Sequence, residues 1–127
     1  SYLQHHGLSN TAILGVIPFS GQAITHFTAR KELGYAELQP TIDSLAPLFW
    51  VTKEAPPLLL ITGDRELEMA GRYEENAYLL RMLKLVGHQD VRLVALEGYG
   101  HDMTYPAFPL LIAEVDRLLA KQKINEH

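Results

Sequence analysis

The chain has 127 residues, enough for one small domain, and its 47% hydrophobic and 20% charged residues are ordinary for a globular protein. The formal charge of -4 gives no electrostatic reason to expect nucleic acid or an anionic membrane surface as a partner, and no apolar run approaches the roughly 20 residues of a membrane-spanning helix. The absence of cysteine excludes disulfides, a thiol nucleophile and thiolate metal sites, and leaves the compartment unknown.

The first predicted element is a short buried strand over residues 13–19, which ends in the turn residues Ser20 and Gly21. Residues 22–54 show a weak pattern with scattered charges and prolines, so we expect an excursion with one short helix. A second strand, residues 58–61, reads Leu-Leu-Leu-Ile after two prolines. Its lack of polar alternation is typical of a parallel strand that is covered on both faces.

The second half of the chain alternates between helix and strand. An acidic stretch, residues 64–68, leads into a helix that reaches about Val86 and is capped by Gly87. Residues 91–96 form a third strand, and after a loop a final helix opens near Pro106 with an expected buried stripe of Phe108, Leu111, Ile112, Val115 and Leu119. This order predicts an α/β fold with about three parallel strands and flanking helices.

Titratable side chains follow the predicted strands. His101 follows the third strand, while Asp64, Glu66 and Glu68 follow the second. The loops at the carboxyl ends of parallel strands converge, so an acid and the imidazole are expected to meet there. A carboxylate that accepts the ring N–H suits a general base in acyl transfer. The alternative is a structural histidine, with acids that only complement a helix dipole.

Two segments carry a family resemblance. Ala-Pro-Pro-Leu-Leu-Leu-Ile-Thr-Gly-Asp-Arg-Glu-Leu-Glu (residues 55–68) and Glu-Gly-Tyr-Gly-His-Asp-Met (residues 97–103) resemble the α/β-hydrolase esterases and lipases, in their carboxylesterase and feruloyl-esterase-like branch. Residues 15–21 look like the strand that follows the nucleophile-bearing helix of that family. The resemblance implies that residues 1–127 are the C-terminal half of an α/β-hydrolase domain. It also implies a carboxylic ester hydrolase that uses no cofactor and no metal.

The resemblance assigns roles to residues of the site. His101 matches the catalytic histidine, which takes and returns a proton while an upstream serine attacks the ester. The family's acid typically stands three positions beyond a strand-ending glycine, and that offset from Gly63 leads to Glu66. Asp64 is the alternative if the loop is one step tighter. Glutamate is an accepted acid in this family.

The nucleophile is missing from the sequence. None of the four serines lies in the Gly-x-Ser-x-Gly motif, which should precede residue 13. We therefore expect the chain to belong to a longer polypeptide and to be inactive alone. Its first strand would then leave an apolar sheet edge, which we expect the N-terminal half or a second copy to cover.

Three further residues are predicted to contact a small-molecule ester substrate. Ser20 is expected to line the pocket at the end of the first strand, and His26 to line it with Phe27, although an ordinary loop histidine is the alternative. Trp50 with Phe49 is expected either to form an acyl-pocket wall or to fill the core. Arg72 and Glu75 suit a solvated helical face. A non-catalytic α/β binding or interaction module is the alternative to the esterase function.

Overall fold

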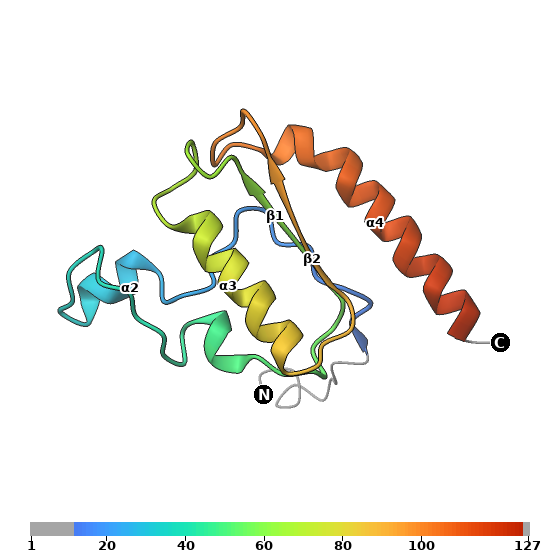
Figure 1. The fold of residues 1–127 in the computed structure, drawn as a ribbon, viewed down its shortest axis with the longest axis horizontal. Helices are drawn as coiled ribbons and strands as arrows, with labels where there is room; N and C mark the ends of the chain where they lie inside the picture. The colour runs from blue at the N-terminus through green and yellow to red at the C-terminus, as the bar shows by residue number, and fades with distance from the viewer. Residues whose placement is uncertain (1–11, 126–127) are drawn as a thin grey trace.

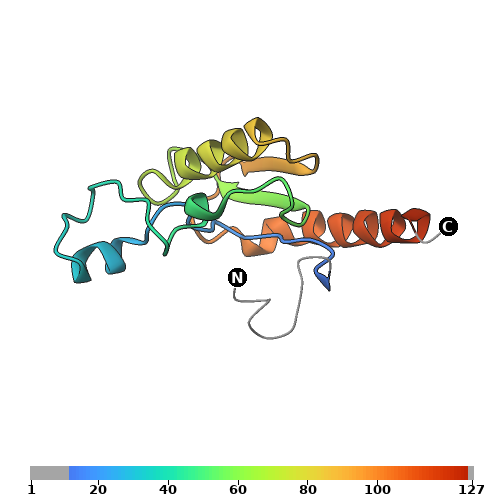
Figure 2. The same cartoon turned by 90° about the horizontal axis from the view of Figure 1, so that it is seen from below.

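The computed structural model describes residues 12–125, in which two helices flank a pair of parallel strands (Figure 1). The elements are helix α2 (Phe27–Glu32), 3-10 helix η2 (Pro47–Trp50), strand β1 (Leu58–Gly63), helix α3 (Arg72–Leu85), strand β2 (Val91–Leu96) and helix α4 (Thr104–Asn125). Figure 2 shows α3 on one side of the strands and α4 on the other. This combination of helices and parallel strands agrees with the expected α/β class at a coarse level.

Strands β1 and β2 pair in parallel, from Leu58 opposite Val91 to Gly63 opposite Leu96. The interior of β1 is covered on both faces, and Leu60, Ile61 and Thr62 are 0% exposed. This confirms the prediction from the uninterrupted apolar run, because a strand with only one covered face would alternate. Complete burial of a leucine or isoleucine side chain contributes about 2 kcal/mol, so β1 is the centre of the fold.

The predicted strand at residues 13–19 is extended but does not form a regular third strand. Val16 pairs with Leu58 and Phe19 with Ile61 as isolated parallel bridges. The amide of Val16 donates to the carbonyl of Pro57, and the amide of Ser20 donates to that of Ile61. Pro18 lies between these bonds and has no N–H to donate, which interrupts the ladder. The expected count of three strands was therefore wrong by one, although this segment runs beside β1.

Each face of the strands has its own apolar cluster. Leu60 and Val91 pack with Leu79 and Leu83 of α3 on one face. Leu59 and Ile61 pack on the other face with Met103 and Ala107, at the start of α4. Alternate residues of β1 therefore bind opposite helices, which follows from the two-residue side-chain period of a strand. These two clusters hold the carboxyl ends of the strands in place.

Helix α3 begins later than predicted. The acidic residues 64–68 lie in a turn-rich loop, and the helix starts at Arg72 after Gly71, whose φ is 78°. The amides of Leu67 and Glu68 both donate to the carbonyl of Asp64, which forms one turn that does not continue as a helix. Gly71 takes the left-handed conformation that glycine adopts without penalty, and this conformation separates the loop from the helix.

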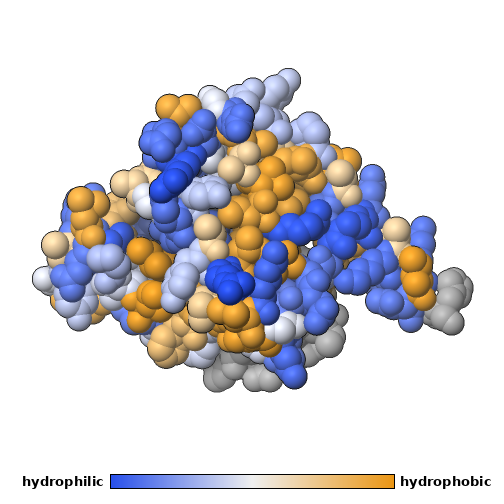
Figure 3. All heavy atoms as spheres, viewed as in Figure 1, coloured by the Kyte–Doolittle hydropathy of each residue, from blue (hydrophilic) through white to orange (hydrophobic). Residues whose placement is uncertain are grey.

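Helix α4 carries two apolar stripes, and the predicted one is not buried. Ala107, Glu114 and Leu118 form its buried face, and Glu114 pairs there with Arg92 of β2. The predicted stripe is instead largely open, with exposed fractions of 53% for Phe108, 49% for Ile112, 40% for Val115 and 42% for Leu119. Both stripes have helical spacing, so spacing alone did not distinguish them. Figure 3, in the view of Figure 1, shows apolar atoms gathered over the centre of this face, while the C-terminal part of α4 is mainly hydrophilic.

Residues 22–54 form the expected excursion with a short helix. Helix α2 extends away from the strands, as Figure 1 shows, and η2 brings the chain back toward them. Thr25 anchors the excursion, because its amide donates to the carbonyl of Thr41 and its hydroxyl donates to Asp43. Thr25 is 0% exposed, so these bonds satisfy polar groups that water does not reach.

Candidate functional site

The loop that carries His101 passes directly over the end of β1. The amide of Asp64 donates to the carbonyl of Tyr99 at 2.6 Å. A Cβ atom on Gly63 would lie 2.3 Å from the carbonyl oxygen of Gly100 and 2.4 Å from that of Tyr99. Glycine is therefore required at position 63, because any side chain would push the histidine loop away. Gly98 begins this loop with a φ of 83°, in the left-handed region.

Asp64 fastens the histidine loop and does not contact the ring. One of its carboxylate oxygens accepts from the amide of Gly98 at 3.1 Å, and the other accepts from the amide of Glu66 at 2.9 Å. These two backbone hydrogen bonds, with Glu66 the stronger influence, lower the pKa of the Asp64 carboxyl. Among the described residues no contact joins Asp64 to His101, so the expected pairing is not formed.

Glu66, the first choice of acid from sequence, points elsewhere. Its side chain is exposed, and no hydrogen bond or ion pair to His101 is present among residues 12–125. The physical reason is the turn in which it lies. Asp64 and Glu68 are one helical turn apart and share a side of the loop, whereas a residue two positions after Asp64 faces the opposite side. The geometry favours Glu68 over both predicted acids.

Glu68 is the carboxylate beside His101. Its Oε2 lies 3.4 Å from Nδ1 of the ring, and its side chain is 0% exposed, whereas that of His101 is 50% exposed. The amide of Gly63 donates to Oε1 at 2.9 Å, and the amide of Met69 donates to Oε2 at 3.0 Å. Backbone groups at the tip of β1 therefore hold the carboxylate in one orientation.

Glu68 is held in its ionised form. Burial alone would raise its pKa, but hydrogen bonds from Ser20, Gly63 and Met69, with a smaller contribution from His101, lower it below the ordinary value. Donors aimed at a carboxylate stabilise its charged form, and this is how a buried acid stays negative. An ionised carboxylate next to an imidazole favours a ring proton on the nearer nitrogen.

Ser20 also contacts the histidine ring. Its Oγ lies 2.7 Å from Nδ1 of His101, and the residue is only 3% exposed. Its φ of 48° is the only left-handed value outside glycine among residues 12–125. The predicted role of lining an open substrate pocket does not fit this burial. Ser20 and Glu68 both lie at Nδ1, on the same side of the ring.

Helix α3 holds the backbone of Ser20 in place. A guanidinium nitrogen of Arg72 donates to the carbonyl of Ser20, and the side-chain amide (Nδ2) of Asn76 donates to the carbonyl of Gly21 at 2.8 Å. Glu75 accepts from the amide of Ala23 at 2.6 Å. These residues are spaced as one helical face, and that face is buried against residues 20–23 instead of solvated as predicted. These side chains are polar, and polar residues on a helix normally predict a face exposed to water. The apolar spacing of α3 therefore gave no indication that this face is buried.

The pair of Arg72 and Glu75 is itself buried. Their side chains are each 9% exposed, and the Arg72 Nε lies 3.6 Å from Glu75 Oε1. Desolvation raises the pKa of Glu75 above its ordinary value, more than the Ala23 amide and the Arg72 charge lower it. Loss of either partner would leave a buried charge unpaired. We therefore expect the Arg72–Glu75 pair to hold α3 against residues 20–23.

The second nitrogen of His101 is open. Within residues 12–125 no hydrogen bond is made by Nε2, and no serine hydroxyl lies at hydrogen-bonding distance from it. A ring whose Nδ1 faces an ionised carboxylate and whose Nε2 is free has the arrangement of a general base. Chemically, the site is equipped to accept a proton at Nε2 from a group supplied by other residues.

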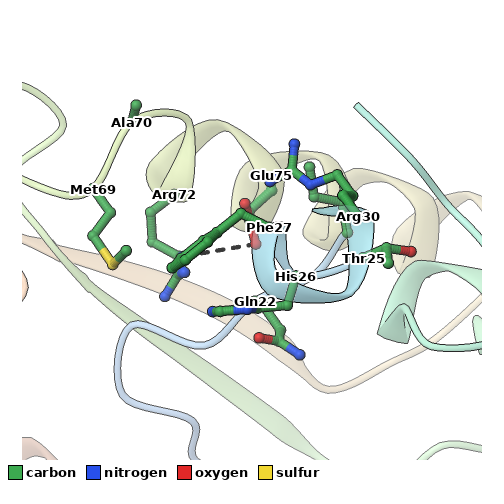
Figure 4. A pocket seen from close by; sticks show the side chains of 10 residues that line it. Gln22, Thr25, His26, Phe27, Arg30, Met69, Ala70, Arg72 and Glu75 are labelled. Atoms are coloured by element: carbon green, nitrogen blue, oxygen red, sulfur yellow. Dashed lines mark ion pairs between the residues drawn. The ribbon is translucent and has the colours of Figure 1, made fainter. Parts of the chain in front are cut away.

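Among the described residues, no hydrogen bond or ring contact joins His26 or Trp50 to His101. His26 caps α2 by accepting from the amide of Thr28, and it lines a cavity of about 40 Å³ with Arg72 and Glu75. Figure 4 shows this cavity between the chain near His26 and Phe27 and the start of α3. Such a volume suits ordered water, since pockets for small-molecule ligands measure about 300 Å³ or more. Trp50 is 62% exposed and donates its indole N–H to the carbonyl of Ser44.

No group of three His, Asp or Glu side chains in the part of the chain that the structure describes lies close enough to hold a metal ion. No helix among these residues combines the length and apolar character that crossing a membrane requires. Comparisons with protein-family models, with curated proteins and with solved structures give no match to this chain. The function is therefore inferred from the arrangement of Glu68, Ser20 and His101.

Proposed function

We propose that this chain supplies the base and the acid of a serine-type carboxylic ester hydrolase of the α/β-hydrolase class. The observation that carries the proposal is the buried, ionised Glu68 at Nδ1 of His101, opposite an open Nε2. The acid is Glu68, in place of the Glu66 and Asp64 that the resemblance indicated. The proposed domain is the C-terminal half of that fold.

In the proposed reaction His101 acts at Nε2. A serine hydroxyl from outside residues 12–125 attacks the ester carbonyl while Nε2 takes its proton, and Glu68 stabilises the positive ring. The proton then passes to the leaving alcohol, which departs as the acyl-enzyme forms. Water then attacks the acyl-enzyme while Nε2 of His101 takes its proton. The serine regains a proton from the ring as it leaves, and the carboxylic acid is released. The residues described here hold and move the proton and need no cofactor for these steps.

The segment at residues 13–20 has an exposed edge to which a partner strand could bind. Val16 and Leu14 are 39% and 41% exposed, and a groove of about 170 Å³ runs between this segment and Val115 and Leu119 of α4. Within residues 12–125 the amides of Ile17 and Phe19 make no hydrogen bond on the side away from β1. We propose that a parallel strand from an upstream half of the same polypeptide pairs here.

A second copy of the chain fits this edge less well. Two copies related by a two-fold axis would pair their edges in antiparallel directions, which places the other copy's site at the opposite end. A parallel upstream strand would instead end beside Ser20, where a following loop can present a hydroxyl to Nε2 of His101. The direction of pairing therefore favours the upstream half.

The test is to express the complete reading frame that contains this sequence and to treat the folded protein with a fluorophosphonate probe. We expect one serine outside residues 12–125 to be labelled and p-nitrophenyl acetate to be hydrolysed. His101→Ala should abolish turnover. Glu68→Gln should reduce kcat by about 10⁴-fold, as replacement of the triad aspartate by asparagine does in a serine protease. The matched control Glu66→Gln should retain turnover.

Two results would contradict the proposal. A folded, complete protein that is neither labelled nor hydrolytic would favour the alternative, a non-catalytic α/β binding or interaction module. Equal losses of turnover in Glu66→Gln and Glu68→Gln would show that proximity to Nδ1 does not identify the acid. The 127 residues alone are expected to be inactive, because they contain no Gly-x-Ser-x-Gly motif.

A further inference from the structure

Ser20 is held in a conformation that serine rarely adopts. Its φ of 48° lies in the left-handed region, where a Cβ atom crowds the backbone. Its amide donates to the carbonyl of Ile61 at 2.7 Å, and its own carbonyl accepts from Arg72. Such strain persists only where the surroundings impose it, and it often accompanies a functional role. Here the imposed backbone aims the hydroxyl at His101.

The distances make the hydroxyl the nearer partner of the ring. Ser20 Oγ lies 2.7 Å from Nδ1, whereas Glu68 Oε2 lies 3.4 Å from the same atom. Good N–H···O hydrogen bonds span about 2.7–3.2 Å, so the hydroxyl is within that range and the carboxylate is beyond it. Ser20 is therefore the direct hydrogen-bond partner of Nδ1, and the Glu68 carboxylate lies slightly farther from the same nitrogen.

The donors and acceptors of the three groups are consistent with one direction of hydrogen bonding. Glu68, which the amides of Gly63 and Met69 hold in place, has its Oε2 3.4 Å from Nδ1, and an ionised carboxylate only accepts. This negative carboxylate favours the tautomer that carries the proton on the nearer nitrogen, Nδ1. Nδ1 of His101 must then carry the proton that is donated to Ser20.

We propose that Ser20 is a positioning residue that accepts the Nδ1 proton of His101 beside Glu68, so that the neutral ring carries its proton on Nδ1 and its lone pair on Nε2. This inference rests on the proposed function, because the lone pair on Nε2 is what a base needs in that reaction. Ser20 is not the nucleophile. It lies on the nitrogen that faces the acid, and at 3% exposure its hydroxyl does not reach a substrate.

The proposal is tested on the chain itself by the tautomer of His101. The chain carries ¹⁵N-labelled histidine, and long-range ¹H–¹⁵N spectra are recorded near pH 8.5, where an ordinary imidazole is neutral. The signal of His101 is identified by its loss in His101→Ala. We expect the wild-type ring to be protonated on Nδ1.

Two variants remove the hydroxyl in different backbones. Ser20→Ala keeps the backbone strain, while Ser20→Gly relieves it, because glycine adopts a positive φ freely. We expect the ratio of Nδ1–H to Nε2–H tautomers to fall about tenfold in both, as for the loss of one hydrogen bond in a charged network. Ser44→Ala, which removes a serine hydroxyl elsewhere, should leave the ratio unchanged.

The same spectra give the outcomes that would overturn the proposal. A wild-type ring protonated on Nε2 would contradict it. An unchanged ratio in both Ser20 variants, with a changed ratio in Glu68→Gln, would show that the acid acts on the ring directly. If Ser20→Ala does not fold, Ser20→Gly alone decides. Absence of ester hydrolysis in the complete protein, with the expected ratios intact, would refute the proposed function and leave this connection standing.

Discussion

The carboxyl end of the sheet and the outer face of α4 differ in how complete they are. At the carboxyl end, Glu68 is 0% exposed in its side chain and receives two backbone hydrogen bonds. On the outer face, Val115 and Leu119 are 40% and 42% exposed beside Leu14, which is 41% exposed. The polar site is satisfied by groups within the chain, whereas the apolar face has no cover among residues 12–125.

This difference reflects two kinds of interaction. Hydrogen bonds are directional, and a buried network is stable only when its members satisfy one another, so it is built where the contacts lie. Burial of apolar surface has no direction, so any surface of suitable shape can cover an exposed stripe. The site is thus organised before any partner binds, while the exposed apolar face of α4 is where a partner is expected to bind.

The largest effect is expected from Arg72→Met. The variant removes the cation of a buried pair and also the donor to the Ser20 carbonyl. We expect the free energy of unfolding to fall by about 3–5 kcal/mol in urea denaturation, because the carboxyl of Glu75 is left buried without its partner. Arg65→Met is the matched control. Its pair with Glu74 is exposed, and its loss should cost under about 1 kcal/mol. Similar losses of unfolding free energy in both variants would show that burial does not make the Arg72–Glu75 pair more important than the exposed Arg65–Glu74 pair.

Gly63→Ala should cost about 3 kcal/mol, since the added Cβ meets backbone atoms that cannot rotate away. Gly34→Ala is the control for the loss of a glycine, because a Cβ there meets no atom within 4 Å although its φ is +87°. That change should cost about 1–2 kcal/mol, from the left-handed conformation alone. Thermal and urea unfolding measure both. A smaller loss at Gly63 than at Gly34 would contradict the close approach of the histidine loop.

Stability should fall in acid because of Glu68. Its folded-state pKa lies below the ordinary value of 4.5, so the stabilisation is present above that value and is lost as the pH falls through the folded pKa. We expect Glu68→Gln to be less stable than wild type by about 2 kcal/mol at pH 7 and to lack this acid-side loss. Glu66→Gln should follow the wild-type curve. Urea denaturation over a range of pH values gives these profiles, and identical profiles for the two variants would count against a buried, ionised Glu68.

Glu75 gives the opposite sign and serves as the internal contrast. Burial raises its folded-state pKa above the ordinary value of 4.5. Its contribution is therefore greatest below that value and declines as the pH rises through the folded pKa. Glu75→Gln should remove this decline in the same denaturation series, and a profile that keeps it would contradict the assignment.

The smallest effect is expected from Ile112→Gln on the exposed stripe of α4. Ile112 is 49% exposed, so its replacement by a good helix former should change stability by under about 1 kcal/mol. Leu118→Ala, on the buried face of the same helix, should cost about 2 kcal/mol or more. Sedimentation should show weaker self-association in Ile112→Gln if the stripe is bare in solution. Equal losses of stability would show that both stripes are packed.

Several features were predictable from sequence because they depend on local pattern. The apolar run before Gly63 predicted β1, since a strand covered on both faces needs continuous apolar residues. The run at residues 91–96 predicted β2, although it contains Arg92 and only Val91 in it is buried. The position of His101 after β2 also followed from chain order. The start of α3 and the buried stripe of α4 did not, because turns and helices share their residue types and two stripes had the same spacing.

By itself the sequence determined which residues form β1 and β2 and which side chains follow them. Only the tertiary structure decided that Glu68 and Ser20 both lie at Nδ1 of His101, and that the polar face of α3 is buried. The physical reason is that strand formation depends on the period of neighbouring residues, whereas the choice among Asp64, Glu66 and Glu68 depends on where each side chain points after the turn. That direction is set by Gly63 and by the loop that crosses it.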